Sequence, residues 1–591
     1  MKKRLMCLLM GAILLLSVML TGCGDTAATE EDIASDTARD TQTLVVYLMS
    51  EEAVSAQTEY DIEEAINEKT RSKFKTQLDL RFFTEDKYYT EVEAKLKAKE
   101  KEIKAADKVA KDKKKYEKWL RESCKQASVS YIPVTTAKVE TVITEEATLV
   151  DAEYGIIKYV YPDPEENQID IFYVGGYDKY KSYMDEDWIA KLNEELDTSS
   201  KKLKEHIPTL YMTNLKEDGI YGIPTNGAIG EYTWMLLNKE LMTKYCHLEQ
   251  NIDYLLNADS SNMDEDLYNF LSDVKENEPG YIPVYGDLEP ANIYYWTMDP
   301  ETLRLTNSKS VIGAAVGQYQ DKGARIWATN LYGNDKYTNQ LKMIKRLELE
   351  GFMATEEDLA ATTMKPFAMG YMKGGYDVYL EYSDEYYVKV VERPRAGEDD
   401  IYSDMFCVND MENNLSRAME IVTYINTQSE PRNILQYGIE GEHYYIENDG
   451  VLRRNKNNGY KMDVAKTGNV FMAHPEEGYP ADYWDQWVQQ NESAKSYPTY
   501  GFRIDWSSNP DTEKVVELEE LYDYYYDQYA ACKTIEEVDA FFAKAKAEIN
   551  ANEAFVFVKN RDYLAEDGHE KDPVPLMKIY SDWLDMNYPI A

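Results

Sequence analysis

The order of apolar runs at the start of the folded chain constrains the fold most strongly. Thr43–Met49, TLVVYLM, is an apolar run with the length of a buried strand. The next segment is amphipathic, with Ile62, Ala65 and Ile66 at helical spacing. Leu78–Phe83, LDLRFF, then has the pattern of a second strand. Strand, helix and strand in this order predict an α/β fold, with a parallel sheet whose strands are joined by crossover helices.

The amino terminus has the pattern of an export signal. Basic residues at positions 2–4 precede the apolar run Leu5–Leu20, which is shorter than the about 20 apolar residues that span a bilayer. Leu20–Cys23 resembles the lipobox of bacterial lipoproteins. That resemblance implies that residues 1–22 are a signal peptide and that Cys23 carries a lipid; the alternative is an ordinary secretory signal with an incidental cysteine. Residues 23–40 are small and acidic, so we expect a flexible tether there.

Charge and motif content exclude several classes of function. The formal net charge of −43 disfavours binding to nucleic-acid phosphates. The five histidines show no zinc-binding spacing and no phosphate-binding glycine loop occurs, so we expect no metal and no cofactor. The cysteines after Cys23 are far apart in sequence, and we expect them to be mostly free, buried thiols: Cys124, Cys246, Cys407 and Cys532.

Tyrosine is unusually abundant, with 50 residues beside nine tryptophans. A tyrosine offers a flat apolar face and a hydroxyl group. Sugars present C–H faces and hydroxyls that match both, so the composition favours a carbohydrate ligand. The alternative is that the tyrosines only build strands and surfaces.

Farther along, two segments bear on function. Asp86–Ala127 predicts one long helix rich in lysine and glutamate, either a solvated amphipathic helix or an arm that docks a partner. Ile169–Tyr180 predicts a buried strand that ends at Gly175 and Gly176, and α/β sheets bind ligands beyond such strand ends. The other expected elements are strands within 139–161, 221–242, 367–380 and 385–396, and helices at 334–350, 415–426, 517–529 and 535–549.

Five stretches together resemble the extracellular solute-binding proteins of ABC importers, the group that includes maltose-binding protein. They are the lipobox, VVYLM, DIFYVGGYDKY, the YGIP…LLNKEL segment, and ILQYGIEGEHYYIENDG at Ile434–Gly450. The resemblance covers about residues 41–591. The segment of about 95–165 is longer than the simplest family pattern.

The resemblance implies two α/β lobes joined by a hinge that the chain crosses three times. We expect the crossings at Ala228–Thr233, Ser403–Val408 and Thr499–Trp506. An N-lobe would then comprise residues 41–230 and 405–500, and a C-lobe residues 231–404 and 501–591. A ligand that touches both lobes would favour the closed form.

Candidate ligand-binding residues follow from strand ends, from the crossings and from the resemblance. Strand ends on the N-lobe nominate Glu51 and Glu52, and the glycine turn adds four more; the alternatives are a solvated acidic pair and a plain tight turn. The crossings add Glu231, Trp234 and Trp506, and the resemblance adds residues of the C-lobe such as Trp296. The tryptophans could equally pack the hinge or the core. The full set is Glu51, Glu52, Gly175, Gly176, Tyr177, Asp178, Glu231, Trp234, Trp296, Gly370, Tyr371 and Trp506. His443 favours a structural hydrogen bond in a loop over catalysis, and His474 with two neighbouring acids is weak evidence for a metal.

These observations predict a lipid-anchored receptor on the outer face of the bacterial cytoplasmic membrane. It would be a monomer and not an enzyme, and would pass a sugar or oligosaccharide to an ABC permease. The alternatives are a receptor of the same fold for a peptide, a surface enzyme acting on glycans, and an adhesion protein without an importer. Two carboxyl groups about 5–10 Å apart across a bound sugar would favour the enzyme.

Overall fold

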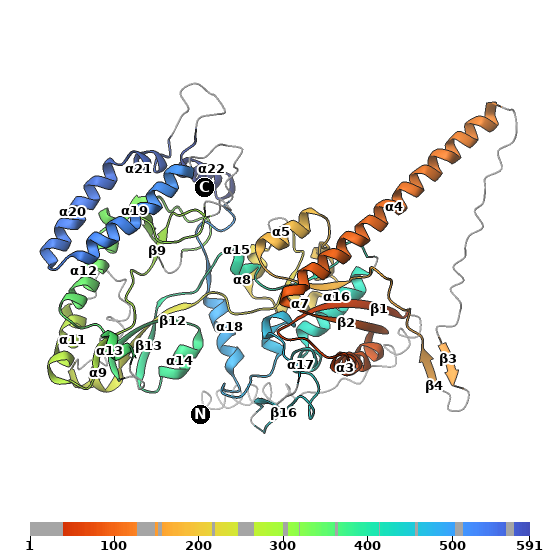
Figure 1. Cartoon of the computed structure of the whole chain (residues 1–591), viewed down its shortest axis with the longest axis horizontal. Helices are drawn as coiled ribbons and strands as arrows, with labels where there is room; N and C mark the ends of the chain where they lie inside the picture. The colour runs from red at the N-terminus through yellow and green to blue at the C-terminus, as the bar shows by residue number, and fades with distance from the viewer. Residues whose placement is uncertain are drawn as a thin grey trace, which may run out of the picture.

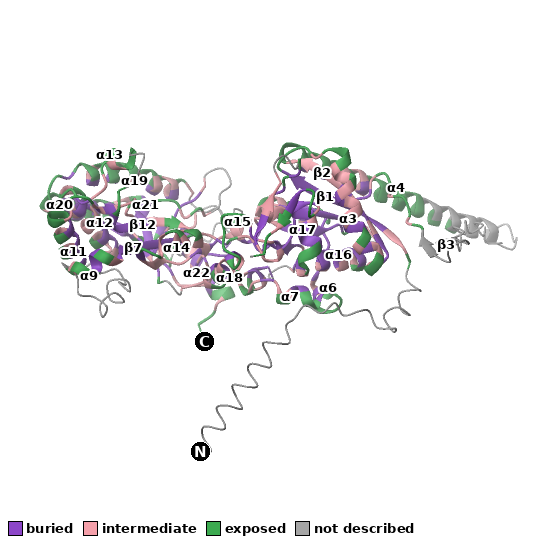
Figure 2. Ribbon diagram, turned by 90° about the horizontal axis from the view of Figure 1, so that it is seen from below, coloured by how far each residue is buried: buried purple, intermediate pink, exposed green. Residues whose placement is uncertain are grey.

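The computed structural model is an α/β molecule with two lobes and one long projecting helix (Figure 1). It describes residues 40–126, 148–151, 156–215, 219–245, 265–299, 305–317, 320–360, 365–412, 414–448, 450–455, 459–502, 512–562 and 573–590. Buried residues gather inside each lobe, whereas the projecting helix is exposed (Figure 2).

The first lobe is built on a five-stranded sheet in the order β2-β1-β5-β15-β6. β1 pairs in parallel with β2 and β5, and α3 connects β1 to β2, so the predicted strand–helix–strand start is confirmed. α3 begins after Ser55, whose hydroxyl caps the Thr58 backbone N–H. The strands are β1 (Gln42–Ser50), β2 (Thr76–Thr84), β5 (Ile171–Val174), β15 (Met405–Val408) and β6 (Ile223–Pro224), and α3 spans Ala56–Phe74.

Helices pack against this sheet, and two short hairpins belong to the same lobe. The first core joins residues of β1 and β5 to apolar residues of α16 and α17, so segments far apart in sequence share one interior. The elements are α4 (Glu85–Gln126), α5 (Tyr177–Asp185), α6 (Asn193–Asp197), α7 (Lys201–Glu205), α8 (Thr209–Asn214), α15 (Glu398–Ile401), α16 (Leu415–Thr427), α17 (Ser429–Tyr437), β16 (Tyr444–Ile446), β17 (Leu452–Arg454), η2 (Val464–Lys466), η3 (Val470–Met472) and α18 (Tyr483–Ser493), with the hairpin β3 (Thr148–Asp151) and β4 (Ile156–Tyr159).

The second lobe contains a four-stranded sheet, β13-β7-β12-β8, and a three-stranded sheet, β11-β10-β9. A separate core packs the small sheet against the helices of the chain's last hundred residues. The strands are β7 (Tyr232–Asn238), β8 (Ile282–Tyr285), β9 (Ile293–Tyr295), β10 (Ile312–Ala315), β11 (Thr329–Asn330), β12 (Phe367–Gly374) and β13 (Tyr386–Glu392). The helices are α9 (Lys239–Tyr245), α11 (Glu265–Asn277), η1 (Leu331–Gly333), α12 (Asp335–Leu349), α13 (Glu356–Ala360), α14 (Tyr376–Tyr382), α19 (Thr512–Ala531), α20 (Ile535–Ala551), α21 (Glu553–Val558) and α22 (Leu576–Asn587).

The chain passes between the lobes three times, which confirms the predicted two-lobed α/β fold. The first passage joins β6 to β7, and its Gly230 has a positive φ and lies against the backbone of Arg395. The other two passages pair with each other, because β14 (Arg395–Ala396) and β18 (Lys495–Ser496) form a two-stranded parallel sheet.

The structure corrects the position of the second crossing. Ser403–Val408 was predicted to be the hinge, but β15 within it pairs with β5 and β6 in the first sheet. Ile401 and Tyr402 also belong to the first core, so the passage lies near Arg395. The predicted strand at 367–380 likewise ends at Gly374, and α14 begins after the glycine pair.

The predicted long helix is confirmed as α4, which runs from Glu85 to Gln126. Its first turns bury Tyr88, Val92 and Leu96 in the first core, and the remainder projects from the lobe (Figure 1). Cys407 and Cys532 are buried free thiols, as predicted. Cys23 and Cys246 lie outside the described residues, and the Cys124 side chain is likewise not described. Among the described helices, none has the length and apolar character needed to cross a bilayer.

Candidate functional site

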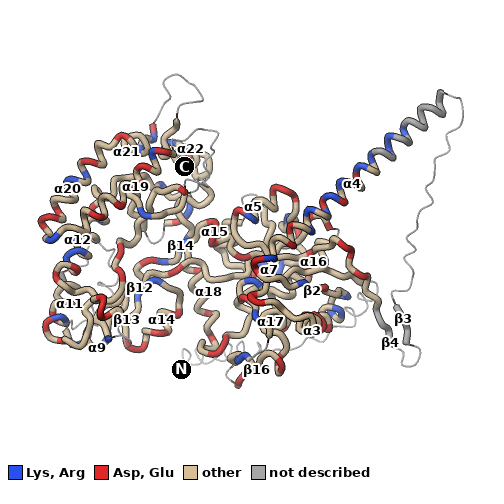
Figure 3. The backbone as a smooth tube through the Cα atoms, in the orientation of Figure 1, with Lys and Arg blue, Asp and Glu red and all other residues tan. Residues whose placement is uncertain are grey.

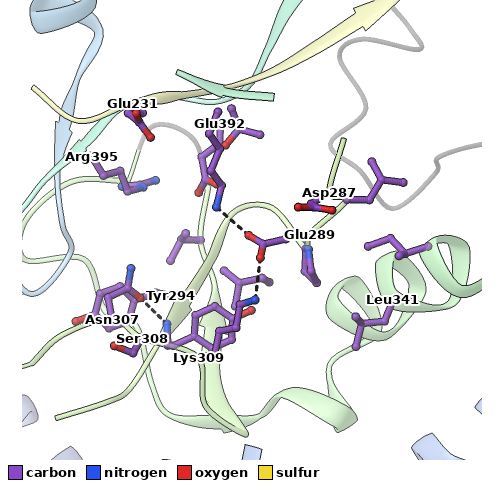
Figure 4. A pocket seen from close by; sticks show the side chains of 18 of the residues that line it. Glu231, Asp287, Glu289, Tyr294, Asn307, Ser308, Lys309, Leu341, Glu392 and Arg395 are labelled. Atoms are coloured by element: carbon purple, nitrogen blue, oxygen red, sulfur yellow. Dashed lines mark hydrogen bonds and ion pairs between the residues drawn. The ribbon is translucent and has the colours of Figure 1, made fainter. Parts of the chain in front are cut away.

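A cavity of about 820 Å³ opens in the second lobe beside the hinge (Figure 4). Strands β7, β12 and β13 contribute one side, and the three-stranded sheet, α12 and α19 contribute the other. In Figure 4, Glu231, Glu392 and Arg395 lie on one side of the hollow, with Asn307, Ser308 and Lys309 across from them. The volume falls within the range of about 300–1,000 Å³ that is typical of ligand pockets.

Tyrosine rings form much of the cavity wall. Tyr522 and Tyr526 are one turn apart on α19, and their rings stack with centroids 5.7 Å apart at an angle of 19°. Tyr526 is 45% exposed, so its face is open to a ligand. Tyr294 is fixed in the cavity wall by a hydrogen bond between its hydroxyl and that of Thr499, which are 2.6 Å apart. The other rings that line the cavity are Tyr295, Tyr497 and Tyr529.

A three-residue charge cluster lies among these rings. Lys309 and Lys373 donate hydrogen bonds of 2.8 Å to the two carboxylate oxygens of Glu289. Burial raises the pKa of Glu289, but the two lysines outweigh that effect and hold the pKa below its ordinary value. The Glu289 carboxylate is therefore ionised at neutral pH, and its ion pairs with Lys309 and Lys373 present groups of both signs to the cavity.

The hinge side of the cavity supplies further charged side chains, among them Glu392 and Arg395. Arg395 donates to the carbonyls of Gln320 and Gly317 at 2.9 and 2.8 Å, which joins β14 to a second-lobe loop. Burial lowers the pKa of Arg395 and raises that of Glu392, which accepts the Asn292 backbone N–H at 3.2 Å. A ligand in this cavity would therefore touch segments that lie at the passage between the lobes.

A smaller pocket of about 450 Å³ lies on the first lobe. Its base is the turn after β5, where Gly176 adopts φ 87° and precedes α5. Gly175 has no room for a larger side chain, because an added Cβ would lie 2.6 Å from the Tyr173 hydroxyl. The pocket is lined by Glu93, Gly175, Gly176, Tyr177, Asp178, Lys179, Ser182, Tyr183 and Asp399.

Helix α15 connects the two hollows. Asp399 lines the first-lobe pocket, and the next residue, Asp400, lines the second-lobe cavity. The two walls are thus adjacent at α15 although their other residues come from different lobes. This arrangement suits a ligand that contacts both lobes.

A second aromatic surface lies where α14 meets α18. On α14, the rings of Tyr376 and Tyr379 are 4.8 Å apart, and beside α18 those of Tyr479 and Tyr483 stack at 4.2 Å. Trp487 extends this surface along α18. These rings line none of the described pockets, and both helices lie near the junction of the two lobes in Figure 1.

Solved structures of similar fold are extracellular solute-binding proteins. The N-glycan transport solute-binding protein from Streptococcus pneumoniae is 14% identical, with 92% of this chain and 99% of that chain covered and a TM-score of 0.49. An HMO-binding, ABC-transporter-associated solute-binding protein from Bifidobacterium longum infantis is 12% identical, with coverages of 93% and 99% and a TM-score of 0.43. A family 1 extracellular solute-binding protein from Alicyclobacillus acidocaldarius is 11% identical, with coverages of 86% and 99% and a TM-score of 0.39. No protein-family model and no curated protein sequence matches the chain.

The structure brings part of the predicted site together. Gly175, Gly176, Tyr177 and Asp178 line the first-lobe pocket, and Glu231 lines the second-lobe cavity. Two other predicted acids line neither hollow: Glu51 forms an ion pair of 2.5 Å with Lys461, and Glu52 is exposed. Trp506 and the lipidation candidate Cys23 lie outside the described residues.

For four predicted residues the structure corrects the expectation of ligand contact, because their side chains or backbone are buried in the second lobe. Trp296 is 0% exposed in the core, so its ring is closed to a ligand. Trp234 donates its indole N–H to the carbonyls of Gly374 and Gly375, which fixes it behind β12. Gly370 is in the middle of β12 against the Phe367 ring, and the Tyr371 hydroxyl donates to the Glu289 carbonyl.

The tyrosine and lysine residues of the cavity were not predicted individually. One signal was present in the sequence: Tyr522, Tyr526 and Tyr529 follow the spacing of one helix face. His443 has the structural role predicted for it, since its Nδ1 accepts the Ile439 backbone N–H at 3.0 Å. Within the described ranges, no group of three or more His, Cys, Asp or Glu side chains is placed to hold a metal ion.

Proposed function

We propose that this chain is an extracellular receptor that captures a carbohydrate in the second-lobe cavity. One observation carries the proposal: a hollow of about 820 Å³ beside the hinge combines stacked tyrosine faces with ionised hydrogen-bonding groups. The rings of Tyr522 and Tyr526 suit the C–H faces of a sugar. Lys309, Lys373 and Glu289 suit its hydroxyls, because both donors and acceptors are at hand.

The first lobe would complete the site when the lobes close. Glycine turns let a ligand approach the backbone, so a sugar held on the tyrosines would meet Gly175 and Gly176. Asp178 would accept hydrogen bonds from sugar hydroxyls, and Glu231 would do so from the hinge. Closure follows only if the ligand binds the closed form better than the open one, which contact with both lobes provides. Glu51, Glu52 and Trp506 stay predicted contacts of the closed form.

The receptor would be held at its membrane and would do no chemistry. A lipid on Cys23 and the tether of residues 23–40 would keep a monomer on the outer face of the cytoplasmic membrane. From there it would pass the sugar, unchanged, to an ABC permease. The basis is the signal and lipobox pattern at the amino terminus together with the hinge between two lobes.

A thermal-shift panel tests this proposal. The chain from residue 24 to 591 would be melted with mono- and oligosaccharides and, as controls, with short peptides. A ligand of the folded state adds about 2.7 kcal/mol to the free energy of unfolding at 100 times its dissociation constant. A rise in melting temperature with one glycan class, which is recovered intact, is expected. A rise with peptides alone, or a cleaved glycan, would contradict the proposal and favour the peptide receptor or the enzyme.

A further inference from the structure

The projecting part of α4 carries a lysine stripe along one face. Lys101, Lys104, Lys108, Lys111, Lys115 and Lys118 follow one another at spacings of three and four residues, and all six are exposed. Side chains at this spacing share a helix face. The stripe extends over eighteen residues, 101–118, and its ends are about 26 Å apart at 1.5 Å per residue.

The stripe is free of the rest of the described chain. The last hydrogen bond that joins α4 to another described element is from the Asn167 amide to Glu102. Beyond Glu102, no hydrogen bond or ion pair connects a described side chain of the helix to another part of the described structure. Lys104 pairs with Glu100 of its own helix. Figure 3 shows the basic residues along the helix as it leaves the lobe. No contact within the described part of the chain thus accounts for this row of lysines.

Its charge is opposite to that of the molecule as a whole. From Lys101 to Lys118 the sequence has eight lysines and four acids, whereas the whole chain has a net charge of −43. Charges separated by more than about 8 Å are largely screened at physiological salt. Lys108 and the lysines after it lie about 9 Å or more along the helix from Glu102, the last contact with the lobe, so the acidic body does not cancel their attraction for an anionic surface.

We propose that the lysine stripe docks onto anionic phospholipid headgroups. A straight row of charges on one face of a rigid helix can contact a planar surface along its whole length. The curved surface of a globular protein would contact only a few turns of the helix. Basic segments bind anionic membranes by this attraction. If Cys23 carries the proposed lipid anchor, anionic headgroups are also within reach, because Cys23 is 17 residues from Asp40, or about 60 Å of extended chain.

Docking by α4 would orient the receptor as well as hold it. α4 and β1, to which the tether leads, both belong to the first lobe. Two attachments on that lobe would fix it at the membrane and leave the second lobe free to move.

Vesicle flotation of the chain from residue 24 to 591 tests this proposal without the lipid anchor. Vesicles of phosphatidylcholine alone would be compared with an equimolar mixture with phosphatidylglycerol. In the test variant, glutamine replaces all six stripe lysines, which keeps helix propensity. A control variant makes the same change of charge at six exposed lysines elsewhere: Lys201, Lys202, Lys533, Lys544, Lys546 and Lys559.

The native chain and the control variant should float with the anionic vesicles only, and the stripe variant should bind about 100-fold more weakly or not at all. Binding should also weaken as salt is raised. Three results would overturn the proposal: equal binding to both vesicles, equal binding by the stripe variant, or stripe-dependent binding to polyglutamate with none to vesicles, which would indicate an acidic protein partner. Circular dichroism and the glycan thermal shift of the stripe variant show separately whether it folds and whether the proposed function holds.

Discussion

The second-lobe cavity and the first-lobe pocket differ in how they could bind the same ligand. The cavity is about 820 Å³, with stacked rings and an ionised Lys–Glu–Lys cluster already in place. The pocket is about 450 Å³ and centres on a glycine turn that offers backbone and few large side chains. The difference implies a division of work: the second lobe holds the ligand, and the first lobe adds contacts on closing. The predictions below test this division, from the largest expected effect to the smallest.

Loss of both stacked rings should weaken glycan binding most. Each ring in Tyr522→Ala/Tyr526→Ala would contribute about 1–1.5 kcal/mol by stacking, so the double variant should bind about 30- to 150-fold more weakly by calorimetry. Tyr524→Ala is a matched control, because Tyr524 is on the same helix and 54% exposed but does not line the cavity. Equal losses in the variant and the control would place the ligand elsewhere.

Removal of one lysine from the charge cluster should have the next largest effect. Lys373→Met takes away a charged donor and leaves Glu289 with one partner, and such hydrogen bonds contribute about 1.5 kcal/mol, so affinity should fall about tenfold. Lys365→Met is the control, since Lys365 also pairs with a carboxylate, that of Asp358, at 2.7 Å but outside the cavity. Unchanged affinity in Lys373→Met would remove the cluster from the site.

The first lobe should contribute less to affinity. Asp178→Asn keeps the shape of the pocket and removes one charge, so affinity should fall about threefold, or less than 1 kcal/mol. Asp185→Asn, at the other end of α5, is the matched control. If Asp178→Asn weakened binding more than the loss of both rings, the division between the lobes would be reversed.

The smallest effect concerns the pH dependence of stability. Burial raises the pKa of Glu392 above its ordinary 4.5, so its carboxylate is disfavoured in the folded chain. Below the ordinary pKa the group is protonated in both states, and the free energy of unfolding is unaffected. As pH rises through the higher pKa of the folded state, burial of the carboxylate lowers the free energy of unfolding. Glu392→Gln should therefore raise the melting temperature by a few degrees at about pH 8 and leave it unchanged at about pH 4. A rise in melting temperature that occurs only at acid pH would contradict this prediction.

The fold was predictable where local pattern decides it. The start β1–α3–β2 follows from two apolar runs around an amphipathic segment, and α4 follows from its length and composition. The second crossing was misplaced because a buried strand and a hinge strand look alike in sequence. Only pairing with β5 and β6 assigns β15 to the first sheet.

The site was predictable in its first-lobe part and not in its second. Gly175–Asp178 directly follow a buried strand, so topology alone puts them at a sheet edge. The cavity collects Tyr294, Tyr497 and Tyr522 from separate segments, and no local pattern connects them. Trp296 was misassigned for a related reason: a flat apolar ring suits a core as well as a sugar, and tertiary packing decides which.

A crystal structure of the chain with a glycan from the thermal-shift panel tests the central claim most directly. The account predicts intact glycan in the second-lobe cavity, stacked on Tyr522 and Tyr526, with the first-lobe turn at Gly176 closed over it. Glycan bound on the aromatic surface of Tyr376, Tyr483 and Trp487, with the cavity empty, would contradict it.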